Sequence, residues 1–202
     1  DASIIIYDIQ GREVILPSNT FLATAIAVLN AGGTPIFADC GDDMSLDPQD
    51  AALRVTDKTA AITQVHIGGI VSEGILQTKG LCEELDIPLI EDAAQAHGSV
   101  LAGQKAGTFG KASAFSFFST KVMTTGEGGM ITTNDKKYAE KIVQLRDHGI
   151  SKTKRYWHTV LGYNYPKSKW YSYSYNILDT NKSKNNNLFK KILNKISSNN
   201  EK

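Results

Sequence analysis

The segment FSFFSTKVMTTGEGG, residues 115–129, places one lysine, Lys121, between a hydrophobic run and a cluster of glycines. The run before the lysine has the composition of a buried strand, and the glycines after it allow the backbone to adopt positive φ angles. A lysine that only solubilises a surface needs neither neighbour. The segment therefore predicts an amine held in a crevice at the end of a strand.

Segments with strand patterns and segments with helix patterns alternate along the chain. Strands are expected at residues 13–18, 34–39, 59–67, 87–92, 112–118 and 129–134, and helices at 21–33, 45–55, 72–86 and 135–149. Apolar strands separated by helices are typical of an α/β fold, with a mostly parallel sheet flanked by helices on both sides. In such sheets the chemistry collects at the carboxyl ends of the strands. These ends are residues 18–21, 66–69, 91–97 and 119–129.

Two of the expected helices carry end signals. The pair Gly32–Gly33 is expected to close the helix at 21–33, because glycine takes the left-handed conformation that commonly ends a helix. In the second helix, Asp47 is expected as the N-cap and Pro48 at the first helical position.

Composition excludes several classes of protein. The 202 residues are 41% hydrophobic and 21% charged, which is typical of a globular protein, and the net charge of +1 gives no reason to expect nucleic acid or a membrane surface as partner. No apolar run approaches the roughly 20 residues that a membrane-spanning helix needs. Cys40 and Cys82 lack the spacing of a metal or redox motif and are expected to be reduced thiols. A cytoplasmic protein is expected.

The composition changes near Pro166. Residues 1–165 are rich in Ala, Gly, Ile and Val and are assigned to one domain, whereas residues 166–202 are dominated by Lys, Asn, Ser and Tyr. This second segment is too polar to bury enough surface for a core, so a disordered tail is expected there. Its one helical pattern, at residues 188–196, predicts a short basic helix.

Lys121 and Asp92 each follow a strand and can therefore face one crevice. An amine that attacks a carbonyl, with an acid held near it, suits an enzyme that forms a Schiff base. With pyridoxal phosphate (PLP), the lysine would hold the aldehyde while the carboxylate keeps the ring nitrogen protonated. Taken singly, Lys121 is better explained as a surface lysine and Asp92 as a turn or cap residue.

Three longer segments, taken together, indicate a function more specifically than these two residues do. They closely resemble the signature segments of the DegT/DnrJ/EryC1/StrS family of PLP-dependent sugar aminotransferases, and they read EVILPSNTFLATA, LIEDAAQAHGS and FSFFSTKVMTTGEGGMITTND. The resemblance runs from about Glu13 to Tyr165. It implies the aspartate aminotransferase-type fold (fold type I), and within that fold it makes residues 1–165 a partial PLP-binding large domain.

The resemblance also implies roles for single residues. Lys121 matches the lysine that bonds to the cofactor aldehyde and then shuttles a proton during transamination. Asp92 matches the aspartate that pairs with the pyridine nitrogen, and Gln95 matches a residue that contacts the ring near its phenolic oxygen. Retention of the lysine argues against the family's dehydratase branch, in which this lysine is replaced.

Three further positions follow from the same resemblance. Phe21 matches the aromatic residue that stacks on the cofactor ring, although an ordinary core aromatic at a helix start is an equal alternative. Ser116 matches a phosphate-binding hydroxyl. Asn164 matches a residue that reaches the phosphate of the neighbouring subunit, which implies a homodimer or a dimer with a paralogue.

Two other interpretations of the same residues are weaker. His66 and His97 have no neighbours at metal-ligand spacing, so packing in the core or the crevice is favoured and no metal site is expected. The GEGG sequence at residues 126–129 lacks the context of a nucleotide-binding loop and is better explained as backbone freedom around Lys121.

The chain departs from the family pattern at both ends. Residues 1–10 contain no Gly-Thr phosphate-binding turn. The sequence after Tyr165 lacks the family's Arg-Met-Ser/Thr-Asn stretch and its small C-terminal domain. Three hypotheses follow. The chain is an aminotransferase that acts on a nucleotide-linked keto-deoxysugar with glutamate as amino donor, in surface-polysaccharide or amino-sugar biosynthesis. Alternatively it is a truncated, catalytically impaired remnant, or a non-catalytic partner of an intact paralogue.

Overall fold

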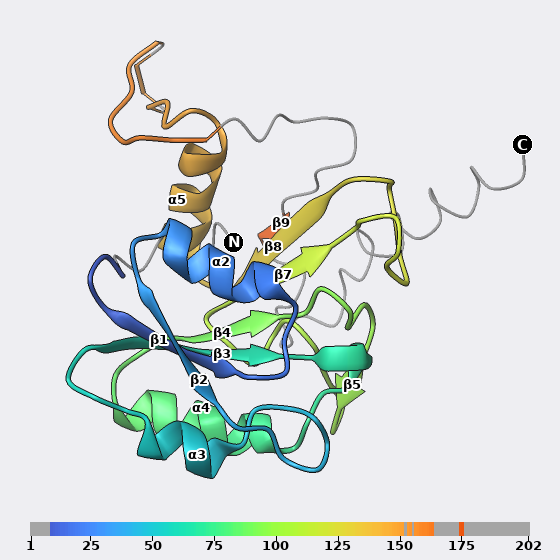
Figure 1. The fold of residues 1–202 in the computed structure, drawn as a ribbon. Helices are drawn as coiled ribbons and strands as arrows, with labels where there is room; N and C mark the ends of the chain where they lie inside the picture. The colour runs from blue at the N-terminus through green and yellow to red at the C-terminus, as the bar shows by residue number, and fades with distance from the viewer. Residues whose placement is uncertain (1–8, 152, 155, 164–173, 176–202) are drawn as a thin grey trace, which may run out of the picture.

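The computed structural model describes residues 9–151, 153–154, 156–163 and 174–175. Within these residues the main feature is one seven-stranded sheet with the order β2-β1-β3-β4-β7-β8-β9 (Figure 1). The first five strands in this order are mutually parallel, whereas β8 runs antiparallel to β7 and parallel to β9. The strands are β1 (Glu13–Pro17), β2 (Thr34–Ala38), β3 (Thr59–Val65), β4 (Leu89–Asp92), β7 (Ala112–Ser116), β8 (Gly129–Thr133) and β9 (Ser174–Tyr175).

Helices cover both faces of the sheet, as the sequence predicts. Figure 1 shows α2 and α5 on one side of the sheet and α3 and α4 on the other. The helices are α2 (Leu22–Asn30), α3 (Pro48–Leu53), α4 (Gly74–Glu84) and α5 (Lys136–Arg146), and a 3₁₀ turn, η1, spans Ile67–Gly69. The predicted α/β class with a mostly parallel sheet is confirmed.

The core is divided between the two faces by the alternation of side chains along each strand. Val14 and Leu16 of β1 and Ile90 of β4 pack with the buried face of α2. Their neighbours Ile15 and Leu89 pack on the opposite face, toward α3 and α4. Successive side chains of a strand point to opposite faces, so every buried strand supplies both halves of the core.

Both predicted helix ends are confirmed by their hydrogen bonds. Gly32 N donates to Leu29 O at 2.9 Å and Gly33 N donates to Val28 O at 3.0 Å. Gly32 has a φ angle of +79°, which is the Schellman arrangement that glycine favours. At the start of α3, Asp47 Oδ1 accepts from Gln49 N at 2.8 Å.

Several predicted boundaries are wrong by a few residues. The strand expected at 59–67 ends at Val65, because the 3₁₀ turn η1 begins at Ile67 and Gly68 has a positive φ angle. The strand expected at 112–118 ends at Ser116, and the helix expected at 135–149 ends at Arg146. Asp135 lies outside that helix as its N-cap, since its side chain accepts from Lys137 N and Tyr138 N.

Two short strands have no counterpart in the sequence prediction. The strands β5 (Val100–Leu101) and β6 (Gln104–Lys105) form an antiparallel hairpin, and two residues are too few to show an alternating pattern. Of the residues after 166, only Ser174–Tyr175 are described, as β9, and the helix expected at 188–196 lies outside the described residues.

The described residues also bear on the cysteines and on membrane insertion. Cys40 and Cys82 are both free thiols, and burial raises the pKa of Cys82 to about 12. Among the helices of the described residues, none is long and apolar enough to cross a membrane.

A buried carboxylate ties the middle of the sheet to the loop that precedes β7. Glu91 is fully buried, and it accepts hydrogen bonds from Gly107 N at 2.7 Å and from Gly110 N at 2.6 Å. The same carboxylate lies 2.9 Å from His66 Nε2, whose side chain is also fully buried. Three polar groups therefore depend on one side chain for their hydrogen bonds.

Replacing Glu91 with alanine should lower the free energy of unfolding by about 3–5 kcal/mol, because buried polar partners would lose their acceptor. Urea unfolding followed by circular dichroism measures this change. Glu84→Ala, at an exposed position on α4, is the control and should change stability little. A loss at Glu91 no greater than that of the control would contradict the assigned role.

Candidate active site

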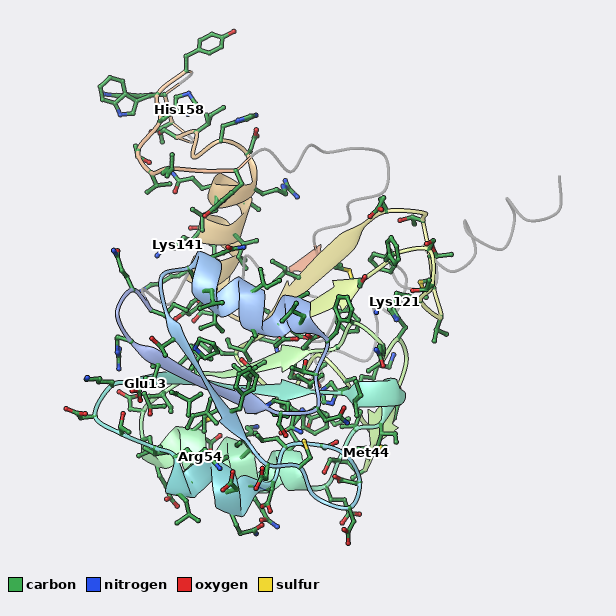
Figure 2. The ribbon with its side chains drawn as sticks, viewed as in Figure 1. Glu13, Met44, Arg54, Lys121, Lys141 and His158 are labelled. Carbon is green, nitrogen blue, oxygen red and sulfur yellow. The ribbon has the colours of Figure 1, made fainter. Side chains whose placement is uncertain are left out.

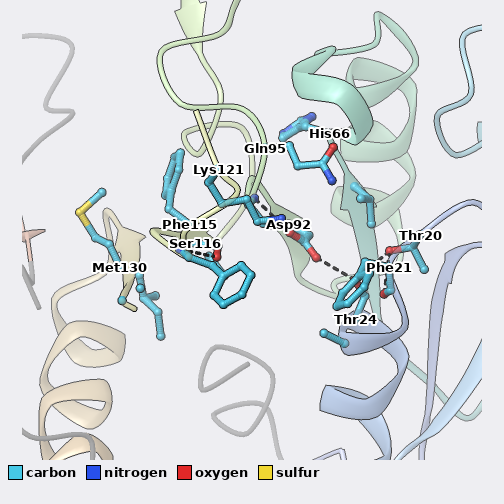
Figure 3. A pocket seen from close by; sticks show the side chains of 18 of the residues that line it. Thr20, Phe21, Thr24, His66, Asp92, Gln95, Phe115, Ser116, Lys121 and Met130 are labelled. Carbon is cyan, nitrogen blue, oxygen red and sulfur yellow. Dashed lines mark hydrogen bonds between the residues drawn. The ribbon is translucent and has the colours of Figure 1, made fainter. Parts of the chain in front are cut away.

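A pocket of about 930 Å³ lies at the carboxyl ends of β3, β4 and β7, within the size range of small-molecule sites. Because β8 is antiparallel to β7, its amino end, at Gly129, meets the same edge and also lines the pocket. The pocket brings together five of the six residues selected from the sequence, which come from three separate segments of the chain (Figure 3): Phe21, Asp92, Gln95, Ser116 and Lys121.

Asp92 is held in the pocket by two donors. It is the last residue of β4, and the alternation of that strand turns it to the α2 face while Glu91 turns to the other. Thr24 Oγ1, in the first turn of α2, donates to Asp92 Oδ2 at 2.8 Å. The backbone N–H of Ala94 donates to Oδ1 at 3.1 Å. Each oxygen keeps a further lone pair, so the carboxylate can still accept a donor from a ligand.

Lys121 lies on the loop that joins β7 to β8. Phe117 holds both ends of this loop, because its N–H donates to Gly128 O at 2.8 Å and its carbonyl accepts from Thr125 N at 2.9 Å. Gly126 has a φ angle of +81°. A Cβ atom at Gly128 would lie 2.6 Å from Thr125 Oγ1. Gly126 thus provides a turn, and Gly128 allows the backbone to lie close to the side chain of Thr125.

The side chain of Lys121 is available for chemistry. In Figure 2 it lies at the opposite end of the sheet from Glu13, the first residue of β1, and Figure 3 shows it extending into the pocket beside Asp92. Within the described part of the chain no ion pair or hydrogen bond of Lys121 Nζ is found. The amine is therefore not committed to a structural contact there.

Gln95 is oriented by the turn η1. Its Oε1 accepts from Gly68 N at 2.7 Å, and an N–H group can donate only to the oxygen end of an amide. This bond leaves the two N–H groups of the amide for a partner in the pocket. The structure therefore presents Gln95 as a donor, which is the polarity that a phenolic or phenolate oxygen requires.

Ser116 and Phe21 lie at two walls of the pocket. Ser116 Oγ accepts from Phe118 N at 3.3 Å, so its own O–H remains able to donate, for example to a phosphate oxygen. Phe21 occupies the N-cap position of α2 without a side-chain cap bond, and 72% of it is exposed. Phe21 is therefore not a core aromatic, and its stacking on a cofactor ring stays a prediction.

The other predicted residues take different places. Asn164 lies outside the described residues, so its predicted contact with a neighbouring subunit remains a prediction. His66 is fully buried against Glu91, and the ring of His97 packs between those of Phe115 and Phe117, at centroid distances of 5.5 and 5.3 Å. Among the described residues no group of three side chains has the arrangement of a metal site.

His97 is the titratable group beside the pocket with a shifted pKa. Burial lowers the pKa of His97 below its ordinary value of 6.5, and the positive charge of Lys121 lowers it further. The imidazole is therefore neutral at physiological pH.

Sequence reasoning missed the two threonines that support Asp92. Thr20 Oγ1 lies 2.8 Å from Thr24 Oγ1, and both residues line the pocket. Their spacing of four residues at the start of a helix was visible in the sequence, but only the packing of α2 on β4 shows that it leads to Asp92. Glu127 and Arg146 also line the pocket and were not selected.

Comparisons with known proteins agree on one family. The profile of the DegT/DnrJ/EryC1/StrS aminotransferase family matches residues 3–167. The GDP-perosamine synthase of Vibrio cholerae is 40% identical over 157 residues, which make up 77% of this chain and 42% of the relative. The chain therefore spans less than half the length of the curated relatives it matches.

Two solved structures show the same relation. The aminotransferase of Psychrobacter cryohalolentis matches with a TM-score of 0.74 and 33% identity, over 81% of this chain and 45% of that one. NtdA of Bacillus subtilis, solved with its bound cofactor PMP, matches with a TM-score of 0.71 and 29% identity, over 81% and 38% of the two chains.

The shifted pKa of His97 predicts how stability depends on pH. Below pH 6.5 the unfolded chain takes up a proton at His97 that the folded chain does not, so stability falls as the pH falls toward the lower, folded pKa. His97→Phe keeps an aromatic ring between its two neighbours and removes the titration. The free energy of unfolding, measured by urea titration between about pH 7.5 and pH 5, should fall more steeply for the unaltered chain than for the variant. Equal slopes would contradict the prediction.

Proposed function

The chain belongs to the DegT/DnrJ/EryC1/StrS aminotransferase family, and from this premise we propose that it binds PLP in the pocket and transfers an amino group to a nucleotide-linked keto-deoxysugar. PLP is the cofactor of the family. The observation that carries the proposal is that one pocket joins an amine with no ion pair or hydrogen bond to the described residues, an oriented carboxylate, an amide donor and a hydroxyl. No other cavity of the described residues enters the proposal.

The side chains of the pocket fit this cofactor. The carboxylate of Asp92 can hold a proton on the pyridine nitrogen, and the amide of Gln95 presents donors suited to the ring oxygen. The hydroxyl of Ser116 is free to donate to a phosphate oxygen, and the ring of Phe21 can stack on the pyridine. When bound, PLP acts as an electron sink through its protonated ring nitrogen.

Lys121 has two tasks in the proposal. Its amine would hold the cofactor by condensing with the aldehyde with loss of water, and once released it would carry a proton between the substrate Cα and the aldehyde-derived carbon C4′. A lysine does this as a neutral base, and the hydrogen bonds of Phe117 with Thr125 and Gly128 join the two ends of the loop that carries it.

The substrate class is proposed from the relatives. The Vibrio cholerae relative is named for a GDP-linked amino sugar, and we propose a nucleotide-linked keto sugar as amino acceptor and glutamate as amino donor. The pocket volume of about 930 Å³ leaves room for a sugar beside the cofactor ring. The products would serve surface-polysaccharide or amino-sugar biosynthesis.

The proposal includes a dimer. Leu22, Ile26 and Leu29 of α2 are 65%, 42% and 57% exposed and lie at helical spacing on one stripe, which supports an apolar contact with a second copy or a paralogue. Together with the predicted reach of Asn164 into a neighbouring subunit, this makes the dimer the proposed working unit. Sedimentation velocity of the purified chain tests it, and a monomer at every concentration would refute the homodimer.

Lys121→Ala should abolish the visible absorbance band that the unaltered chain develops with PLP, because only a lysine-bound aldehyde gives that band. Lys79→Ala, on the surface of α4, is the matched control and should keep the band. Absorbance spectra after removal of free PLP measure the outcome. If the unaltered chain develops no band, the proposed function fails.

Asp92→Asn should keep the visible band but slow amino transfer from glutamate by about 100-fold or more, because the ring nitrogen loses the charge that keeps it protonated. Formation of 2-oxoglutarate in single-turnover experiments measures the transfer. Asp86→Asn, at an exposed turn, is the control. Unchanged turnover at Asp92→Asn would refute the role given to this carboxylate.

A further inference from the structure

We propose that Thr24 is a positioning residue that orients the carboxylate of Asp92 toward the pyridine nitrogen, and that Thr20 sets the hydroxyl of Thr24 in turn. The inference rests on the proposed function. Its basis is a chain of two contacts of 2.8 Å each, from Thr20 Oγ1 to Thr24 Oγ1 and from Thr24 Oγ1 to Asp92 Oδ2.

The direction of the hydrogen bonds in this chain is fixed by chemistry. An ionised carboxylate only accepts, so Thr24 must donate its single hydroxyl proton to Asp92. The oxygen of Thr24 is then an acceptor for Thr20, whose hydroxyl must donate to it. A donor whose own oxygen accepts a hydrogen bond is polarised and donates more strongly.

The side chain of Thr24 is also held in place by packing. It is 4% exposed, in the first turn of a helix whose next buried residues, Ala25, Ala27 and Val28, belong to the core cluster that contains Ile90 of β4. A buried threonine in a helix has few allowed rotamers and commonly bonds to its own helix backbone. Here the hydroxyl instead reaches across to the sheet, so the helix and β4 are joined at Asp92.

Asp92 is thereby held in two directions. Ala94 N donates a hydrogen bond to Oδ1 and Thr24 Oγ1 donates one to Oδ2. These two bonds fix the plane of the carboxylate and leave its remaining lone pairs for a ligand in the pocket. Thr20 directly precedes Phe21, which is the proposed stacking residue. The five residues from Thr20 to Thr24 therefore set two contacts of the cofactor ring at once, the stacking on its face and the acid at its nitrogen.

The experiment separates orientation of Asp92 from general stability. Dissociation constants are measured for PLP and for 1-deaza-PLP, an analogue in which carbon replaces the ring nitrogen while the aldehyde and the phosphate remain. The ratio used below is the dissociation constant of 1-deaza-PLP divided by that of PLP. It reports the interaction of Asp92 with the ring nitrogen, because every other contact is shared by the two ligands. A variant that only loosens the fold weakens both ligands equally and leaves the ratio unchanged.

Thr24→Val, which keeps the shape and removes the hydroxyl, should lower the ratio by about tenfold, toward that of Asp92→Asn. Thr24→Ser, which keeps the hydroxyl, should retain most of the ratio of the unaltered chain. The matched control is Thr78→Val, because Thr78 is a fully buried helical threonine of α4, whose hydroxyl donates to Gly74 O. It should leave the ratio unchanged.

Thr20→Val supplies a second test that does not depend on the folding of Thr24→Val, since Thr20 is only partly buried. It should lower the ratio in the same direction by a smaller factor. An unchanged ratio in both valine variants, or a ratio that Thr24→Ser lowers as much as Thr24→Val does, would overturn the inference while leaving the proposed function intact. Failure of the unaltered chain to bind PLP would instead remove the proposed function and this inference with it.

Discussion

The alternation of side chains along β4 is the constraint on which the site depends. Glu91 and Asp92 are consecutive carboxylates, and the strand sends the first to the α4 face and the second to the pocket. A slip of one residue would exchange them. Such a slip is opposed by the buried partners of Glu91, because Gly107 N, Gly110 N and His66 Nε2 would lose their hydrogen bonds to this carboxylate. The buried carboxylate of Glu91 thus fixes the position of the Asp92 carboxylate in the pocket.

The reversal of direction at β8 explains how an amine reaches the same edge as Asp92. A parallel successor to β7 would require a crossover along the sheet, whereas an antiparallel strand returns directly after a loop. The loop of residues 117–128 therefore stays over the carboxyl ends of β4 and β7 and carries Lys121 with it. Hydrogen bonds between Phe117, at the start of the loop, and Thr125 and Gly128 near its end leave only residues 118–124 between bonded positions. A short segment of this kind limits the motion of the lysine backbone.

The sequence was sufficient for features that local chemistry decides. Gly32–Gly33 and Asp47 identify helix ends because their signals act within a few residues, and Lys121 and Asp92 were placed together because strand ends meet at one edge of a parallel sheet. Features that depend on contacts distant in sequence could not be predicted. The bond from Thr24 to Asp92 joins residues 68 positions apart, and the bond from Gly68 to Gln95 joins residues 27 apart. Neither pair has a local pattern, so only the packing of the elements reveals them.

The two ends of the proposed cofactor are supported unequally by the described residues. At the ring, the proposed acid, donor and amine are Asp92, Gln95 and Lys121, and hydrogen bonds from Thr24 and from Gly68 of η1 hold the first two. At the phosphate, the hydroxyl of Ser116 is the donor among the residues selected from the sequence that the structure describes. A phosphate with two negative charges is bound tightly only by several charge-assisted donors. The ring contacts therefore decide which chemistry the pocket favours, while the affinity for PLP depends chiefly on additional donors at the phosphate, such as the one predicted for Asn164 of a neighbouring subunit.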